Sequence, residues 1–257
     1  MYRQWLNIDA DKSTRVRSLN QSLQHKVAVI VGSSSGMGRA TALAFAAAGA
    51  RVVLAARNKV ELDAVASRIG DAASVCVTDV GDSRAVENLI STTIAALGRI
   101  DILVYATGTN IPERSLDALT SDTWDMMVAT NLTGAFYCTK AVVPVMRKQN
   151  GGLIIYVSSV CVQKPDVSGV SYQATKHGMT GLAHGTFAEE QKNGVRTSII
   201  FPGLTDTPMV LKRPTPTPAE MMAVALQPED IAEACLFVAA LPSRTRVPEL
   251  VLAPAGL

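Results

Sequence analysis

Short apolar runs and longer amphipathic segments alternate along most of this chain of 257 residues. The apolar runs, such as KVAVIVG at 26–32 and RVVLAA at 51–56, are rich in β-branched residues and contain no polar alternation. Uninterrupted runs of this length are typical of strands that are buried on both faces. The sequence predicts strands at 26–32, 51–56, 73–80, 100–106, 152–159, 195–201 and 247–254, and helices at 38–48, 59–70, 83–97, 121–148, 169–192 and from 228 onward.

Strands that alternate with helices over the whole length predict an α/β fold with one doubly wound parallel sheet of about seven strands and helices on both faces. No internal linker interrupts the pattern, so we expect a single domain over 25–257. Residues 1–24 are predicted to be a polar extension. The proline-rich stretch KRPTPTPAE lies between two elements of the same sheet, and we expect it to belong to a substrate lid at about 204–227.

Composition and charge argue against several classes of function. The net charge of +2 indicates no nucleic-acid partner, and no apolar run has the length of a membrane span. The start of the chain has no apolar core of a secretory signal. The four cysteines lack CxxC spacing and the three histidines lack metal-binding spacing. We therefore expect free thiols, no metal site and a cytoplasmic location.

A glycine-rich turn, VGSSSGMGRA, follows the first predicted strand and opens the first helix. Such glycines let the backbone turn tightly and approach a ligand closely, while the helix N-terminus attracts phosphate. The strand–turn–helix context is that of a Rossmann-type dinucleotide site. The predicted cofactor contacts in this turn are Gly32, Ser34, Ser35, Gly36, Met37 and Gly38.

The end of the second strand indicates which dinucleotide is bound. An acidic residue near this point usually binds the ribose hydroxyl of NAD, but LAARN places Ala56 there, followed by Arg57. An arginine can pair with the 2′-phosphate of NADP. The sequence therefore favours NADP, with NAD as the alternative, and Asp79 after the third strand is expected to meet the adenine.

Tyr172 and Lys176, in SYQATKHG, lie four positions apart and therefore on one face of the predicted helix. A phenol beside an ammonium is either an ordinary surface pair or a proton-transfer device. A neighbouring ammonium favours tyrosinate, so we expect the pKa of Tyr172 to fall toward the working pH when the oxidised nicotinamide is also bound.

Taken together, these motifs resemble the short-chain dehydrogenase/reductase family over about residues 25–254. The resemblance is carried by GSSSGMG, the Asp79-Val80 pair, Asn131 in WDMMVATNLTG, the serines of YVSS, YQATK and FPGLTDTP. It implies an NADP-dependent oxidoreductase that moves a hydride between nicotinamide and a carbonyl or secondary alcohol. The implied catalytic residues are Asn131, Ser159, Tyr172 and Lys176.

The resemblance also implies a role for each residue. Tyr172 is the proton donor or base, and Lys176 tunes it and holds the nicotinamide ribose. Ser159 binds the substrate oxygen, with Ser158 as the alternative, because only one of two neighbours in a strand can face the site. Asn131 holds a water that links Lys176 to solvent, or is simply a helix-kink residue. Further cofactor contacts are implied at Val80, Gly108, Tyr172, Lys176, Pro202, Gly203, Thr205 and Thr207.

The chain departs from the family pattern at two places. The fourth strand ends Tyr105-Ala106-Thr107-Gly108, where the family usually has Asn-Asn-Ala-Gly. The C-terminus VPELVLAP instead resembles NADP-dependent 3-hydroxy-acid and serine-type dehydrogenases. Family members commonly assemble, so a homodimer or homotetramer is expected. Two alternatives stay open: a non-catalytic dinucleotide-binding sensor or scaffold of the same fold, and an NAD-dependent alcohol dehydrogenase.

Overall fold

Seven parallel strands form one sheet in the computed structural model, which describes residues 22–256. The strand order is β3-β2-β1-β4-β5-β6-β7, and every neighbouring pair is parallel. The predicted doubly wound sheet is therefore confirmed. The strands are β1 (Val27–Val31), β2 (Arg51–Ala56), β3 (Ala73–Val77), β4 (Ile102–Tyr105), β5 (Gly152–Val157), β6 (Val195–Pro202) and β7 (Glu249–Leu252).

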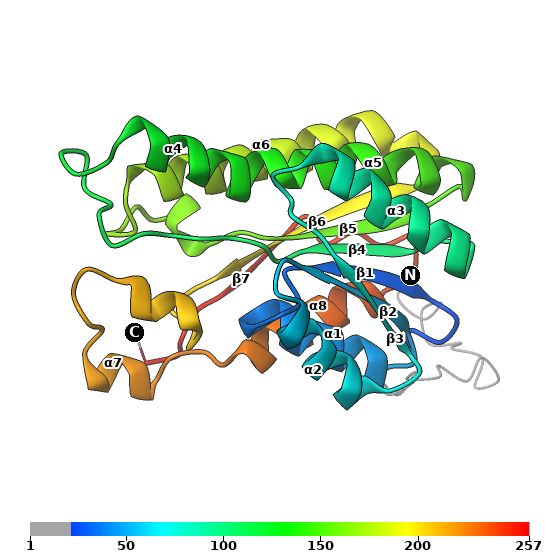
Figure 1. The fold of residues 1–257 in the computed structure, drawn as a ribbon, viewed down its shortest axis with the longest axis horizontal. Coiled ribbons are helices and arrows are strands. Elements are labelled where there is room, and N and C mark those ends of the chain that lie inside the picture. The colour runs from blue at the N-terminus through cyan, green and yellow to red at the C-terminus, as the bar shows by residue number, and fades with distance from the viewer. Residues whose placement is uncertain (1–21, 257) are drawn as a thin grey trace, which may run out of the picture.

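Helices cover both faces of this sheet (Figure 1). One face carries α3 (Ser83–Leu97), α4 (Ser121–Val128), α5 (Gly134–Lys148) and α6 (Val170–Glu190). The other face carries α1 (Gly36–Ala47), α2 (Lys59–Ile69) and α8 (Pro228–Ala240). Each face has its own apolar core, one built around Tyr105, Tyr156 and Met146 and the other around Phe45, Leu54 and Ile155. Within residues 22–256, no helix combines the length and apolar character that crossing a membrane requires.

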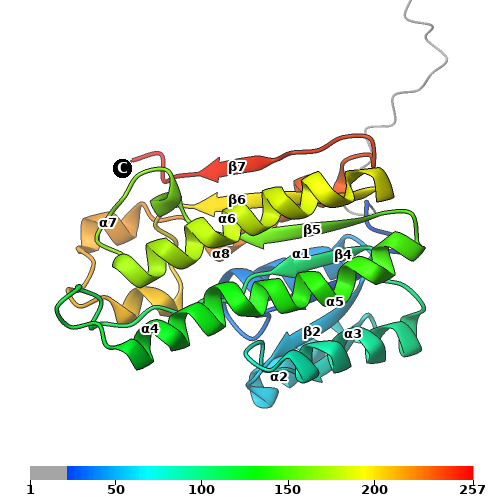
Figure 2. The ribbon, with the colours of Figure 1, turned by 90° about the horizontal axis from the view of Figure 1, so that it is seen from above.

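The predicted long helix at 121–148 is divided by a π-helical turn, η2 (Ala129–Thr133). The helices α4 and α5 lie end to end across this turn (Figure 2). A π turn inserts one extra residue and widens the helix, and such turns are frequent at functional sites. The predicted third strand is also shorter than expected, because it ends at Val77 before Asp79.

The lid segment, which contains α7 (Ala219–Ala223), lies at the carboxyl end of the sheet (Figure 1). Its two ends are joined by a bridge between Thr205 and Leu226, and a short 3-10 helix, η5 (Pro208–Lys212), begins it. Residues 1–21 of the predicted extension lie outside the described residues. Leu23, near the predicted boundary, is buried in the core below α1, so the packed unit includes it.

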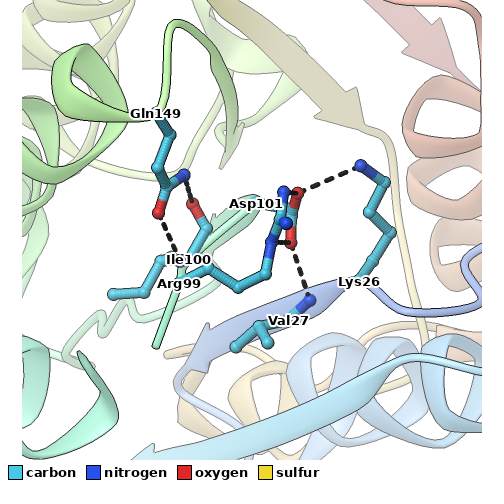
Figure 3. Close-up of polar contacts among 6 residues, drawn as sticks. All are labelled: Lys26, Val27, Arg99, Ile100, Asp101 and Gln149. Atoms are coloured by element: carbon cyan, nitrogen blue, oxygen red, sulfur yellow. Dashed lines mark hydrogen bonds and ion pairs between the residues drawn. The ribbon is translucent and has the colours of Figure 1, made fainter. Parts of the chain in front are cut away.

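The amino ends of β1 and β4 are held together by Asp101 (Figure 3). Its carboxylate accepts hydrogen bonds from Arg99 at 2.8 and 2.7 Å, from Lys26 Nζ at 3.0 Å and from the Val27 amide at 3.0 Å. Burial opposes ionisation, but these donors lower the pKa of Asp101 overall. Gln149, at the end of α5, bonds both the amide and the carbonyl of Ile100. These contacts hold β1 and β4 together at their amino ends, opposite the carboxyl ends of the strands.

We expect Asp101→Asn to lower the free energy of unfolding by about 1–3 kcal/mol, because the amide group turns an NH₂ toward buried donors and leaves one unpaired. Asp63→Asn is the matched control, since the Asp63–Lys59 pair is exposed and such pairs contribute about 0–1 kcal/mol. Urea denaturation of both variants measures the difference. Equal stabilities for the two variants would contradict the structural role of Asp101.

Candidate functional site

A crevice opens at the carboxyl ends of β1 and β4, where the strand order reverses direction. This is the position at which open parallel sheets bind ligands. The crevice has a volume of about 370 Å³. The predicted cofactor residues that line it are Gly32, Ser34, Ser35, Gly36, Met37, Arg57, Asp79, Val80, Gly108 and Thr207.

The glycine turn forms the floor of this crevice, and its shape requires glycine. Gly32 has φ of +91°, and a Cβ there would lie 2.7 Å from the amide nitrogen of Thr107. A Cβ on Gly38 would overlap the backbone carbonyl of Gly32. Gly36 also has a positive φ and faces Thr207 from the lid, at 3.3 Å from its methyl group. The turn is therefore packed so closely against its neighbours that a side chain at Gly32 or Gly38 would collide with backbone atoms.

Charged groups lie at the rim of the crevice. Arg57 follows β2 and is exposed, while Ala56 before it is only partly buried. Asp79 lies after β3, where its carboxylate accepts a hydrogen bond from Gly81 at 2.9 Å. Lys212 reaches across from the lid, and its Nζ donates to Thr109 at 3.0 Å. Among residues 22–256, no cluster of three or more His, Cys, Asp or Glu has an arrangement that could hold a metal ion.

A second, smaller cavity of about 110 Å³ adjoins the crevice. Met37, Thr207 and Met209 line both spaces, so the two lie side by side. The predicted site residues in the smaller cavity are Ser159, Tyr172, Pro202, Gly203, Thr205 and Thr207. Thr205 is buried and its hydroxyl donates to the Gly203 carbonyl, whereas Thr207 lies at the junction of the two cavities.

The two serines after β5 have different surroundings. Ser158 is buried, and its hydroxyl donates to the Lys176 carbonyl at 3.3 Å. Ser159 is only half-buried, accepts a hydrogen bond from the Cys161 amide at 3.3 Å and bonds the Tyr172 side chain. Both residues line the small cavity, but only Ser159 contacts the phenol.

Burial raises the pKa of Tyr172 well above its usual value, and the hydrogen bond with Ser159 lowers this pKa only in part. The predicted fall in the pKa is therefore not found in this structure, because desolvation outweighs the nearby charges. The Lys176 Nζ lies 5.6 Å from the centre of the Tyr172 ring, so the two side chains do face each other as their helical spacing predicts. The neutral phenol, which is the proton-donating form, is the favoured state.

Lys176 is a buried lysine whose ammonium is poorly solvated. Burial lowers its pKa to about 8. Its Nζ donates to the Val157 carbonyl at 2.9 Å and lies beside Gly108, where a Cβ would be 3.3 Å away. Lys176 therefore reaches the crevice floor from α6, and Gly108 leaves room for it.

Asn131 lies at the centre of the η2 turn and is fully buried. Its Oδ1 accepts a hydrogen bond from the Thr109 amide at 2.8 Å, and its Nδ2 donates to the Thr109 carbonyl and to Thr175 Oγ1. The side chain thus connects the loop after β4 to α6. This arrangement agrees with the helix-kink interpretation, and it leaves one lone pair of Oδ1 available for a water.

Sequence reasoning missed the residues that hold this region in place. Tyr105, which stands where the family pattern has asparagine, donates from its hydroxyl to the Thr130 carbonyl in η2 at 2.5 Å. Thr109 and Thr175 are the partners of Asn131. Their contacts span 22–44 positions along the chain, so no local pattern could have indicated them.

Comparison with known proteins agrees with this geometry. A protein-family model described as short chain dehydrogenase matches residues 26–217. An uncharacterized oxidoreductase of Staphylococcus aureus (strain MRSA252) is 34% identical over 233 residues, covering 90% of this chain and 98% of the relative.

Two solved structures have the same fold over most of their length. A serine dehydrogenase in its closed form, complexed with NADP+, has a TM-score of 0.84 at 27% identity and covers 90% of this chain and 96% of its own. A 3-ketoacyl-(acyl-carrier-protein) reductase of Brucella melitensis, complexed with NADH, has a TM-score of 0.84 at 26% identity and covers 91% and 98%. With the glycine crevice and the adjoining cavity in place, the family match is decisive: this chain belongs to the short-chain dehydrogenase family of oxidoreductases.

Proposed function

We propose that the protein is an NADP(H)-dependent oxidoreductase that interconverts a carbonyl compound and a secondary alcohol. The observation that carries this proposal is that Ser159 and Tyr172 line the small cavity beside the crevice, with the Lys176 Nζ 5.6 Å from the centre of the Tyr172 ring. A dinucleotide suits the crevice, because Gly32 and Gly36 line it at the start of α1, where a helix N-terminus attracts a pyrophosphate. When bound, the nicotinamide supplies the hydride.

In reduction, Ser159 donates a hydrogen bond to the substrate oxygen and stabilises the charge that develops on it. Tyr172 then transfers its proton to that oxygen. Its raised pKa keeps the phenol neutral before the reaction, and an alkoxide is basic enough to take the proton. In oxidation, the same residue acts as the base.

Lys176 is proposed to stabilise the tyrosinate that forms and to hold the nicotinamide ribose. One hydrogen of its ammonium is used by the Val157 carbonyl, which leaves the others for these roles. Asn131 keeps the loop after β4 against α6, and we propose that its remaining lone pair holds a water on the route from Lys176 to solvent.

Replacing Tyr172 with Phe removes the transferable proton and preserves the ring. We expect kcat for carbonyl reduction to fall by roughly 100-fold or more, with NADPH affinity nearly unchanged. Tyr137→Phe, which lies outside both cavities on α5, is the matched control. NADPH absorbance over a panel of carbonyl compounds measures both variants, and wild-type turnover by Tyr172→Phe would refute the assignment.

Arg57 is proposed to pair with the 2′-phosphate of NADP, since it is the cation after β2 on the crevice lining. We expect Arg57→Leu to raise the KM for NADPH by about tenfold to a hundredfold, because a charge-assisted hydrogen bond is lost. The KM for NADH should change little. Arg51→Leu is the control, as this exposed arginine lies at the other end of β2. Equal effects of Arg57→Leu on the two cofactors would favour the NAD-dependent alcohol dehydrogenase instead.

The lowered pKa of Lys176 also predicts how stability depends on pH. Below about pH 8 the lysine is charged in both the folded and unfolded states, and its burial costs stability. Between about pH 8 and the ordinary value of 10.5, only the unfolded state keeps the proton, so this cost disappears as the pH rises. As the pH rises from about 8 to 10.5, the wild type should therefore gain stability relative to Lys176→Met, which has no titrating group at this position.

Thermal unfolding at a series of pH values measures this difference in Tm. Lys192→Met, on the exposed surface, is the control that removes a lysine with ordinary solvation. A Tm difference that is the same at pH 7 and near pH 10.5 would show that Lys176 is not desolvated.

The sensor alternative has less support, because a binding protein needs no proton donor beside the crevice.

Two further proposals concern where the protein is located and how it assembles. All four cysteines are free, which supports a reducing, cytoplasmic environment. Exposed apolar side chains on α4 and α5, among them Trp124, Met126 and Phe136, support assembly into a homodimer or homotetramer.

A further inference from the structure

Arg114, in the loop between β4 and α4, is a buried arginine that has no acidic partner. Its side chain is only 7% exposed. It donates from Nε to the Ile111 carbonyl at 2.9 Å and from Nη2 to the Lys212 carbonyl at 2.6 Å. Among the described residues, no carboxylate forms an ion pair with it. Burying a guanidinium without a counter-charge lowers the stability of the fold. An arginine kept in such a position is therefore expected to have a function that offsets this loss of stability.

The surrounding charges do not compensate for this burial. Burial and then the neighbouring Arg213 lower the pKa of Arg114, and the opposing effect of Asp166 is smaller. Asp166 is exposed, and its carboxylate already accepts a hydrogen bond from the Ser168 amide at 2.9 Å. The local charge around Arg114 is therefore positive.

Arg114 lines the same small cavity as Ser159 and Tyr172. Burial raises the pKa of Tyr172 and the charge of Asp166 raises it further, whereas the charge of Arg114 opposes both effects and lowers this pKa by less. Arg213 joins this cavity from the lid, where its Nη1 donates to Thr217 at 3.0 Å. Two guanidinium groups and one carboxylate, that of Asp166, thus line the space in which the proposed proton donor lies, so the cations outnumber the anion there.

The position of Arg114 relative to Tyr172 is fixed by close packing. Gly169, just before α6, has φ of +92°, and a Cβ on it would lie 2.7 Å from the Arg114 Cβ. Asn110 Nδ2 donates to the Ser168 carbonyl at 2.9 Å, which holds the same two segments together. Tyr172 follows three positions after Gly169, so the loop and the phenol are organised before any ligand arrives.

We propose that Arg114, assisted by Arg213, binds a carboxylate carried by the substrate. The enzyme then acts on short oxo acids and hydroxy acids in preference to neutral ketones and alcohols. The planar guanidinium matches a carboxylate in shape and charge, and the cavity of about 110 Å³ suits a small molecule. This inference rests on the proposed function, because the carbonyl end of the same molecule has to reach Tyr172.

A purely structural role for Arg114 makes a different prediction. Its bond to the Lys212 carbonyl connects the loop to the lid, so in a purely structural role Arg114 would act only by holding the lid. A lost lid contact slows charged and neutral substrates alike. Loss of a carboxylate partner slows only the charged ones.

The test compares pyruvate, acetoacetate and levulinate with their methyl esters, each reduced in the presence of NADPH. The three acids differ in the number of carbons between the carbonyl and the carboxylate. For the wild type, we expect kcat/KM for at least one acid to exceed that for its ester by about tenfold or more. Arg114→Met should abolish this preference while leaving the esters within about twofold, and Arg114→Lys should restore part of it.

Arg68→Met, which removes an exposed arginine from α2, is the control and should keep the wild-type preference. The inference is overturned if the wild type prefers the esters, or if Arg114→Met slows acid and ester equally.

Binding of the same six probes to the protein–NADP+ complex, measured by calorimetry, separates this inference from the proposed function. If no carbonyl is reduced but an acid binds about tenfold more tightly to the wild type than to Arg114→Met, the proposed reaction fails and the carboxylate site stands. Equal binding of the acids to the two proteins overturns the site, whatever the turnover.

Discussion

The site depends on how closely two backbone segments approach each other at the carboxyl edge of the sheet. The turn after β1 packs against Ala106 and Thr107 after β4, and the glycine at position 32 is what permits this contact. Parallel pairing of β1 with β4 brings the two segments together, and Asp101 holds that pairing at the opposite edge (Figure 3). The crevice is open because the connections after β1 and β4 lead to helices on opposite faces of the sheet, so neither connection covers the space between them.

The polar groups beside the crevice are buried at a cost to stability. Lys176 and Tyr172 lose hydration, and Arg114 lacks a counter-charge. Surrounding contacts hold these groups in place, since Val157, Ser159 and Lys212 supply their hydrogen-bond partners. Such unfavourable burial is common at functional sites, where a prepared arrangement of charges matters more than local stability.

Much of the fold could be predicted because strands buried on both faces form continuous apolar runs. The five central strands have that pattern, whereas the edge strands β3 and β7 are only partly buried and were indicated by their place in the alternation of strands and helices. The π turn at η2 could not be predicted, because Tyr105 and Asn131 hold it through partners more than twenty positions away. Similarly, the sequence predicts a lowered pKa for Tyr172 from the Lys176 ammonium and a bound oxidised nicotinamide, but residue spacing carries no information about the desolvation that raises this pKa.

The sequence by itself therefore determined the order of the elements, the glycine-rich turn after β1 and the residue types of the candidate site. These depend on periodicity and backbone preference, which act over a few neighbouring residues. Only the tertiary structure decided which polar groups lose their water and which meet across the cavity. Arg114 shows the difference, because nothing in its local sequence indicates that it is buried near Tyr172. Tyr172 lies on α6, which begins more than fifty positions later in the chain. Burial and charge environment are properties of segments brought together by folding, so they arise only when the sheet and its helices have packed.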